Sequence, residues 1–274
     1  MKKPLLDIFL LSFLATVAYA ERITLRLNFG GTYFLDGDYN LAMDGMRNYE
    51  HMVLGPTENF IDNLKKFGLG YQIGGQLLIP VSTKFAIGIE INYLNTSVVS
   101  GFERDWHSYN WTLSPTLSSI PMLLSVNYIT PLGGKIDLHL SAGGGAFFSS
   151  LNYTYDIEDS VHPYSGTWTP DSKTVLGARA GIGLEFELSK KFALTFDISG
   201  QFAEIAGFSG SWEGIYSGIR KSGTGILYRY DYDGQYPMIG IYDIPPVGTH
   251  FQNVQKAKFS LSGISSQIGI KIPL

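Results

Sequence analysis

Cysteine is absent from the 274 residues of the sequence. Its absence excludes disulfides, zinc–thiolate sites and thiol catalysis. Charged residues are scarce, at 16% against the ~25% usual in soluble domains, whereas aromatic residues reach 14%. The formal net charge of −4 leaves no basic surface for nucleic acid. The chain must therefore be stabilised by its fold alone, and no nucleic-acid partner is expected.

Long apolar runs are almost absent as well, and the one at the N-terminus has the features of a targeting signal. Lys2 and Lys3 precede an apolar stretch over residues 5–17, and Ala18 and Ala20 form an A-x-A cleavage site. An uncleaved anchor helix is the alternative, but the stretch is shorter than the ~20 residues that a span requires. We predict a signal peptide at 1–20, cleaved after Ala20, and a single domain at 21–274.

The mature chain contains eight runs in which apolar and polar residues alternate. A strand with lipid on one side and a polar interior on the other has this period of two. In the first run, Leu25, Leu27 and Phe29 alternate with Arg26 and Asn28. The runs cover residues 22–35, 67–79, 85–93, 120–128, 136–148, 176–188, 192–202 and 259–274. In the last run the parity shifts near Gly263, which suggests a β-bulge.

The connections between these runs alternate strictly between short and long. Short links are expected near residues 80–83, 131–134 and 189–191, and long ones at 36–66, 95–118, 149–173 and 207–256. This order is typical of a barrel with short periplasmic turns and four long external loops. We predict an all-β fold, an antiparallel transmembrane barrel of eight strands. Ten strands is the alternative, if a hairpin in the fourth loop joins the wall.

A soluble lipocalin-like barrel or sandwich would also alternate with period two. The polar face here is mostly Gly, Ser, Thr and Ala with few lysines, which suits a cramped interior better than a water-facing exterior. The C-terminus adds Gln267, Gly269, Ile272 and Leu274, in the spacing of the assembly signal at the end of outer-membrane barrels. The layout resembles the small eight-stranded barrels of the OmpA, OmpX and OmpW type over residues 22–274. Outer-membrane location, contact with lipid and lipopolysaccharide, and insertion by the barrel-assembly machinery are what this resemblance implies.

Charged residues of both signs are expected inside the barrel. An eight-stranded barrel has an interior just wide enough for side chains to fill it. Buried charges must pair, because an unpaired one is very costly. We therefore predict a closed lumen held by ion pairs, and a narrow polar channel is the alternative. The predicted lumen residues are Arg26, Glu90, Asp137, His139, Arg179, Glu185, Asp197, Lys258 and Lys271.

The long loops are rich in Trp and Tyr, which provide large contact area at a low cost in entropy. Such residues could contact a surface partner or glycan, or simply pack the loops together. In the fourth loop, Asp233-Gly234 between two alternating stretches predicts a projecting hairpin. The candidate contact residues are Trp106, Trp111, Trp168, Trp212, Tyr230 and Tyr232.

Catalytic and metal-binding patterns are weak. The five histidines are dispersed, and no H-E-x-x-H, G-x-S-x-G or Walker motif is present. His107 beside Asp105, His162 near Asp159, and the acidic pairs at 36–38 and 231–233 are poor candidates for a catalytic or calcium site. We expect a non-enzymatic protein with no cofactor or metal, whose loops contact an unidentified surface ligand or support envelope integrity. The alternative is a narrow pore or a small-solute transporter through the lumen or a lateral opening.

Overall fold

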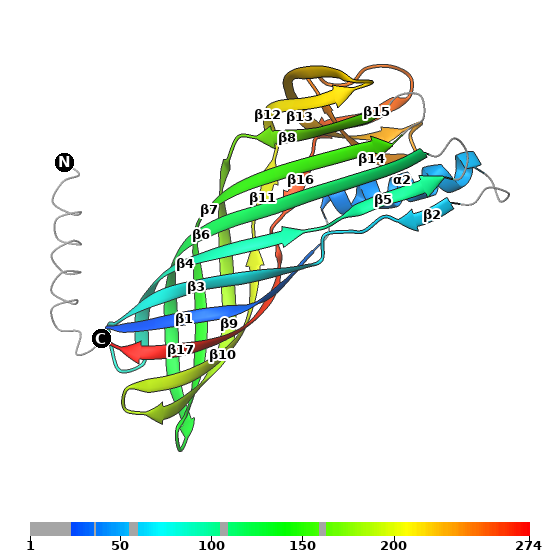
Figure 1. Ribbon diagram of the computed structural model, residues 1–274. Helices are drawn as coiled ribbons and strands as arrows, with labels where there is room; N and C mark the ends of the chain where they lie inside the picture. Colours follow the sequence, from blue (N-terminus) through cyan, green and yellow to red (C-terminus); the bar gives the residue numbers. More distant parts are fainter. Residues whose placement is uncertain (1–22, 36, 55–59, 105–108, 159–162) are drawn as a thin grey trace, which may run out of the picture.

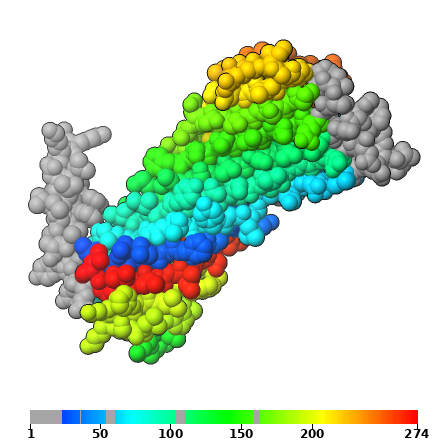
Figure 2. Space-filling view, in the orientation of Figure 1, coloured from blue at the N-terminus to red at the C-terminus, as the bar shows by residue number. Residues whose placement is uncertain are grey.

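Eight antiparallel strands close into a barrel in the computed structural model, which describes residues 23–35, 37–54, 60–104, 109–158 and 163–274 (Figure 1). The closure is made by β1 pairing with β17 and by β6 pairing with β7. Figure 2 shows β1 and β17 side by side, in blue and red. The wall strands are β1 (Thr24–Phe34), β3 (Leu69–Pro80), β4 (Phe85–Ser97), β6 (Tyr109–Gly133), β7 (Ile136–Glu158), β9 (Lys173–Ser189), β10 (Phe192–Phe202) and β17 (Gly263–Pro273).

The prediction of an all-β, eight-stranded barrel with short turns at one end is confirmed. Residues 81–84, 134–135 and 190–191 make those turns, and short turns are typical of the periplasmic side. The hairpin at Asp233-Gly234 also forms, between β13 (Ile219–Tyr232) and β14 (Tyr236–Tyr242). It lies outside the wall, so the barrel has eight strands and not ten.

The wall places apolar side chains outside and polar ones inside. On β1, Leu27 and Phe29 are 50% and 57% exposed, whereas Arg26 and Asn28 are buried. Aromatic rings border the apolar surface at both ends. Tyr71 lies 6.2 Å from Tyr93, and Phe85 5.1 Å from Tyr128. An apolar outer band bordered by aromatic rings, around a polar interior, is the architecture of outer-membrane barrels. The chain therefore folds as an outer-membrane β-barrel.

This polarity inverts partway along the longest strands. On β7, outward side chains are apolar from Ile136 to Phe148, and then polar and exposed at Ser150, Asn152 and Thr154. The inward face changes in the opposite sense, from polar at His139 to apolar and buried residues such as Phe147, Leu151 and Tyr153. The neighbouring β6 changes at the same level.

Two serine pairs mark this level. Ser118 and Ser150 hydroxyls lie 2.8 Å apart on the outside, and Ser119 and Ser149 hydroxyls 2.8 Å apart on the inside. Below the pairs the outer face is apolar, and above them it is polar. The strand thus leaves the membrane at this level and continues into water without a break.

We call the part beyond the inversion the extracellular module. In Figure 1, β6 and β7 continue past the other wall strands to the end that carries it. Besides β13 and β14, the strands that this module adds to the long β6–β7 pair are β2 (Phe60–Asn63), β5 (Ser100–Arg104), β8 (Tyr164–Pro170), β12 (Ser209–Tyr216) and β15 (Phe251–Lys256). The order in its sheet is β2-β5-β6-β7-β8-β12-β13-β14, and β15 also pairs with β13.

One helix, α2 (Asp38–Leu54), packs against β14 and the end of the lumen. Tyr39, Ala42 and Met43 are almost completely buried, and their spacing places them on one face of the helix. Asn40 anchors its first turn, because its side-chain amide donates to the carbonyl oxygen of Phe67 and accepts from the Phe67 N–H. Sequence analysis missed this helix, since it lies in a segment expected to be a loop. Within the described residues no helix is long and apolar enough to span a membrane.

The outer end of the lumen is filled by an apolar core. Tyr39 and Met43 of α2 meet inward side chains of the wall such as Phe147 there. The short pair β11 (Glu204–Ala206) and β16 (Lys258–Ser260) adds Ile205 and Phe259. Each fully buried side chain of this size contributes about 1.5–3 kcal/mol relative to exposure. We call this core the apolar plug.

Three details of the sequence prediction are wrong. The second and third long loops, at 95–118 and 149–173, are mostly strand, because β6 and β7 extend through them. The eighth run does not begin at Phe259. That residue is 2% exposed and belongs to β16, whereas the wall strand begins at Gly263. The parity shift is therefore a break between two strands and not a bulge within one.

Candidate functional site

The lower lumen contains three cations and three carboxylates in direct contact. Arg26 on β1 approaches Asp197 on β10 at 3.3 Å and Glu185 on β9 at 3.6 Å. Glu185 also accepts from Lys271 of β17 at 2.5 Å. A second pair joins Arg179 to Glu90 at 2.5 Å, and Arg179 also donates twice to the Ser199 hydroxyl. Each cation thus has a carboxylate partner, as burial requires.

A chain of neutral groups continues from this network across the barrel. Arg26 contacts His139 Nδ1 at 3.3 Å, and His139 Nε2 lies 2.9 Å from the Asn127 side-chain oxygen. The same Nδ1 also lies 3.4 Å from Asp197 Oδ1, so His139 joins the Arg26–Asp197 pair to Asn127. Gln76 then donates to Asn127 at 3.3 Å and to Ser125 at 3.1 Å. The network therefore extends from β1 and β10 through β7 to β6 and β3.

Little space remains inside this layer. The cavity beside Arg26, Glu90 and Arg179 has a volume of about 20 Å³. A single buried water needs roughly 10–15 Å³, so the cavity is the size of one water and not of a path for solutes. The apolar plug lies beyond it. The lumen is thus closed twice, once by ion pairs and once by apolar packing.

The structure brings seven of the nine predicted lumen residues together, namely Arg26, Glu90, His139, Arg179, Glu185, Asp197 and Lys271. Asp137 lies lower, where it lines a cavity of about 190 Å³ with Glu185 and Lys271 at the periplasmic mouth. Lys258 is misplaced in the prediction, because its side chain is 47% exposed and pairs with Glu204 at 2.9 Å. The reason is that Lys258 belongs to β16 and not to a wall strand.

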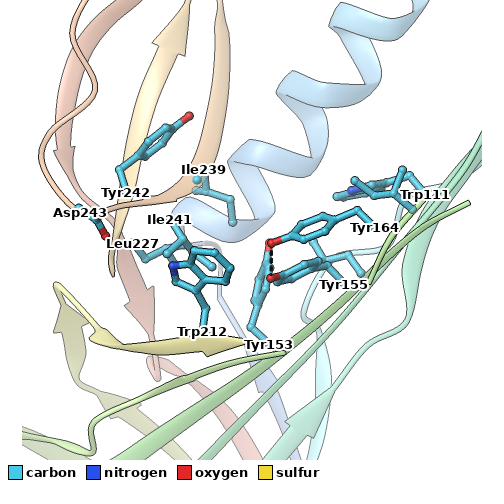
Figure 3. A pocket seen from close by; sticks show the side chains of 13 residues that line it. Trp111, Tyr153, Tyr155, Tyr164, Trp212, Leu227, Ile239, Ile241, Tyr242 and Asp243 are labelled. Carbon is cyan, nitrogen blue, oxygen red and sulfur yellow. Dashed lines mark hydrogen bonds between the residues drawn. The ribbon is translucent and has the colours of Figure 1, made fainter. Parts of the chain in front are cut away.

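A larger cavity of about 470 Å³ lies in the extracellular module (Figure 3). We call it the aromatic pocket. It is formed where the inner face of the sheet, from β6 to β12, meets the β13–β14 hairpin. The sheet contributes Trp111, Leu113, Tyr153, Tyr155, Ile157, Tyr164 and Trp212; the hairpin and the residue after it contribute Leu227, Ile239, Gly240, Ile241, Tyr242 and Asp243.

The turn between β13 and β14 holds this second wall in place. Asp233 and Gly234 both have positive φ, at 51° and 71°. Two consecutive positive φ values are the requirement of a type I′ turn, which fits the twist of a tight hairpin. The hairpin can therefore reverse sharply and bring Ile239 and Ile241 over the sheet.

Polar groups in the pocket are few and mostly engaged. The hydroxyls of Tyr155 and Tyr164 lie 2.7 Å apart, and the dashed line in Figure 3 marks the hydrogen bond between them. Tyr242 donates to the Tyr230 hydroxyl behind the wall at 3.2 Å. Burial, followed by the hydrogen bonds to Tyr164 and Tyr242, raises the pKa of Tyr155 and of Tyr230 well above the usual value for tyrosine. Both hydroxyls are therefore protonated at physiological pH.

The candidate contact residues have different positions. Trp111 and Trp212 line the aromatic pocket. Trp168 is completely buried and donates to the Gly210 carbonyl oxygen, so it is not available to a surface partner. It lies on the inward face of β8, where it packs edge-on against Tyr153. Tyr230 and Tyr232 both contact Phe251 in the module. Trp106 lies outside the described residues.

Sequence reasoning missed the second wall of the pocket. Ile239 and Ile241 alternate along β14 and Asp243 follows it, but only the fold of the hairpin shows that they face Trp111 and Tyr155. The aromatic residues of the third loop were visible as a group. What was missing was that β7 continues and pairs with β8, and that the two strands point Tyr153, Tyr155, Tyr164 and Trp168 to one face.

The C-terminal residues lie on the closing strand. Gln267 and Gly269 face inward and pair with β1 and β10, whereas Leu274 donates its N–H to the Ile23 carbonyl oxygen at 2.8 Å. A side chain at position 269 would collide with Asn28, so glycine is required there. Ile272 pairs with Leu25. Ala18 and Ala20 of the expected cleavage site lie outside the described residues.

The weak catalytic and metal candidates gain no support. His107 with Asp105 and His162 with Asp159 lie outside the described residues, as does Asp36. Asp38 accepts from the Lys258 N–H at 2.7 Å, and Asp231 is paired with Arg229 at 2.8 Å. In the part of the chain that the structure describes, no three His, Asp or Glu side chains converge to hold a metal ion.

Comparisons with known proteins return structures of the same general kind. A major outer membrane protein from Thermus thermophilus is 12% identical, with a TM-score of 0.45 over 92% of this chain and 99% of that one. OprG from Pseudomonas aeruginosa is 12% identical, with a TM-score of 0.42 over 93% and 96%. The outer membrane protease OmpT from Escherichia coli is 4% identical, with a TM-score of 0.44 over 93% and 97%.

These scores are too low to support an inference about activity, and the fold assignment depends on the strand pairing itself. The sequence matches no protein-family model, and no curated protein matches it significantly.

Proposed function

We propose that this chain is a non-enzymatic outer-membrane protein whose extracellular module binds a small organic ligand at the cell surface. The barrel serves as a closed anchor. The observation that carries this proposal is the aromatic pocket. At about 470 Å³, it lies in the range of ~300–1,000 Å³ typical of small-molecule sites. It is lined mainly by apolar and aromatic side chains, which is also typical of such sites.

The pore alternative is less well supported, because the lumen is closed by two different layers. The ion-pair layer leaves only about 20 Å³. Above it, α2 and the β11–β16 pair fill the outer end with buried side chains. A solute would have to displace both layers to cross. Outer-leaflet lipid and lipopolysaccharide around the apolar band, and the assembly machinery acting on β17, remain the expected partners.

The test combines conductance with binding, on protein purified from outer membranes and placed in lipid nanodiscs or planar bilayers. Binding of 4-phenylbutan-1-ol, a neutral aromatic probe, is followed by the fluorescence of the pocket tryptophans. We expect no conductance steps and saturable binding. Tyr155→Ala, which removes a ring from the pocket, should abolish binding. Thr154→Ala changes the exposed outer face of the same strand and should leave binding intact.

Folding is checked for each variant by heat-modifiable gel mobility. If Tyr155→Ala does not fold, Tyr164→Ala replaces it, because Tyr164 also lines the pocket and both reporter tryptophans are kept. Discrete conductance steps would support the pore, and equal probe binding by Tyr155→Ala and the wild-type chain would contradict the pocket.

A further inference from the structure

The aromatic pocket carries charge of one sign. Asp243 is the only charged side chain among the described residues that line it, and these include no lysine, arginine or histidine. Asp243 is exposed at the edge of the pocket, immediately after β14. An anionic ligand would meet a carboxylate and find no positive partner. Charge complementarity therefore favours a neutral or cationic ligand.

Aromatic rings surround the cavity from several directions. Trp111, Tyr155, Tyr164, Trp212 and Tyr242 come from β6, β7, β8, β12 and β14, and Figure 3 shows them around the same space. The face of an aromatic ring is electrostatically negative and attracts a cation. Aromatic cages of this kind are a recurrent means of binding quaternary ammonium groups and amines. The ring arrangement therefore favours the cation over the neutral ligand.

The hydrogen-bonding capacity of the pocket is small. Tyr155 and Tyr164 bond to each other, and the Tyr242 hydroxyl bonds to Tyr230. A sugar would bring many hydroxyls into this space, where the Asp243 carboxylate and the two indole N–H groups are too few to replace their bonds to water. A quaternary ammonium group with an apolar body needs no hydrogen-bond acceptor. The shortage of free polar groups therefore separates an organic cation from a glycan.

We infer that the aromatic pocket binds an organic cation with an apolar body, such as a quaternary ammonium compound or an aralkyl amine. The charged group lies against the ring faces on the side of Asp243, and the apolar body fills the rest of the pocket. This inference rests on the proposed function, because it names the class of ligand for the same site.

The test uses three probes with one apolar body. They are 4-phenylbutyltrimethylammonium, 4-phenylbutan-1-ol and 4-phenylbutanoate, which are a cation, a neutral molecule and an anion. Binding to the purified protein in nanodiscs of zwitterionic lipid is followed by tryptophan fluorescence. The signal of Tyr155→Ala, which reports the partition of each probe into the lipid, is subtracted. We expect the cation to bind about tenfold more tightly than the alcohol, as a partly desolvated cation–π contact allows. The anion should bind more weakly than the alcohol.

Asp243→Asn distinguishes the contribution of the carboxylate to binding from that of the rings. It should weaken binding of the cation by about threefold, the effect of one exposed charge pair, and leave the alcohol unchanged. Binding of the alcohol and the cation with equal affinity would overturn this inference and leave the proposed function standing. Absence of binding by all three probes would overturn both. Preferential binding of the anion would also overturn the inference that the pocket selects cations.

Discussion

The inversion of polarity along β7 makes a direct prediction about where a charge can be placed. Leu140 and Asn152 both point outward from this strand, and Leu140 is 39% exposed whereas Asn152 is exposed. In a water-soluble barrel both positions would face solvent. Here Leu140 lies near the middle of the apolar run, and Asn152 lies beyond the serine pairs. We expect Leu140→Arg to destabilise the barrel strongly and Asn152→Arg to have almost no effect.

The magnitude follows from the geometry of the strand. The two positions are twelve residues apart, or roughly 40 Å along the strand. At a tilt of ~40° this becomes about 30 Å along the membrane normal, more than the ~25 Å height of an apolar band. Arginine near the midplane of a barrel costs about 2–4 kcal/mol, and it costs little in water. The difference between the two variants should therefore be about 2–4 kcal/mol.

The assay is reversible guanidinium unfolding in phospholipid vesicles, monitored by tryptophan fluorescence, with heat-modifiable mobility as the check that each variant inserts. If Leu140→Arg does not insert, Phe148→Arg gives the same comparison from the edge of the apolar run, with a smaller expected cost. Equal midpoints for the two arginine variants would refute the membrane position assigned to β7.

Three further predictions concern the lumen, the hairpin and the helix. Arg179→Met leaves Glu90 buried without its cationic partner and should lower the free energy of unfolding by about 3–5 kcal/mol. Glu90→Leu in the same chain should restore most of that loss, and a restoration below about 0.5 kcal/mol, the margin within which independent sites add, would argue against coupling. Gly234→Ala places a side chain at a φ of 71°, so the guanidinium midpoint should fall by the equivalent of about 1–2 kcal/mol, and an unchanged midpoint would contradict the turn type. Burial raises the pKa of Asp38 above its usual 3.8, so the folded chain keeps this proton at pH values where the unfolded chain has lost it. The free energy of unfolding therefore falls as pH rises through that range. Asp38→Asn should remove this part of the pH dependence, and guanidinium unfolding measured at several pH values across the range checks it.

The wall of the barrel could be predicted from the sequence because membrane and lumen impose opposite demands on neighbouring residues. Leu27 and Phe29 need lipid, and Arg26 needs a partner inside, so the parity of β1 determines both faces. The lumen network followed from the same parity. The prediction of the lumen residues failed at Lys258, because alternation does not show whether a residue belongs to the wall or to a segment folded into the barrel mouth.

The extracellular module could not be predicted in the same way. The alternation in β6 and β7 does not end at the serine pairs; it changes sign, since water replaces lipid outside and the apolar plug replaces the polar lumen inside. Trp111 and Leu113 alternate with Thr112 as regularly as the residues below, but with the opposite orientation. A search for lipid-facing strands discards such a segment as a loop. The aromatic pocket was missed with it, because its walls come from strands far apart in sequence.

The continuity of β6 and β7 also determines how the aromatic pocket is carried. The strands run from the periplasmic turn to the pocket without a hinge, so they hold the pocket at a constant height above the outer leaflet. Two residues added to each of these strands would lengthen them by about 7 Å, which is about 5 Å along the membrane normal at a tilt of ~40°, and would preserve the facing of every ring. One residue added to each would turn the rings outward and the serines and threonines inward. The reach of the module can therefore change in evolution only in steps of two residues.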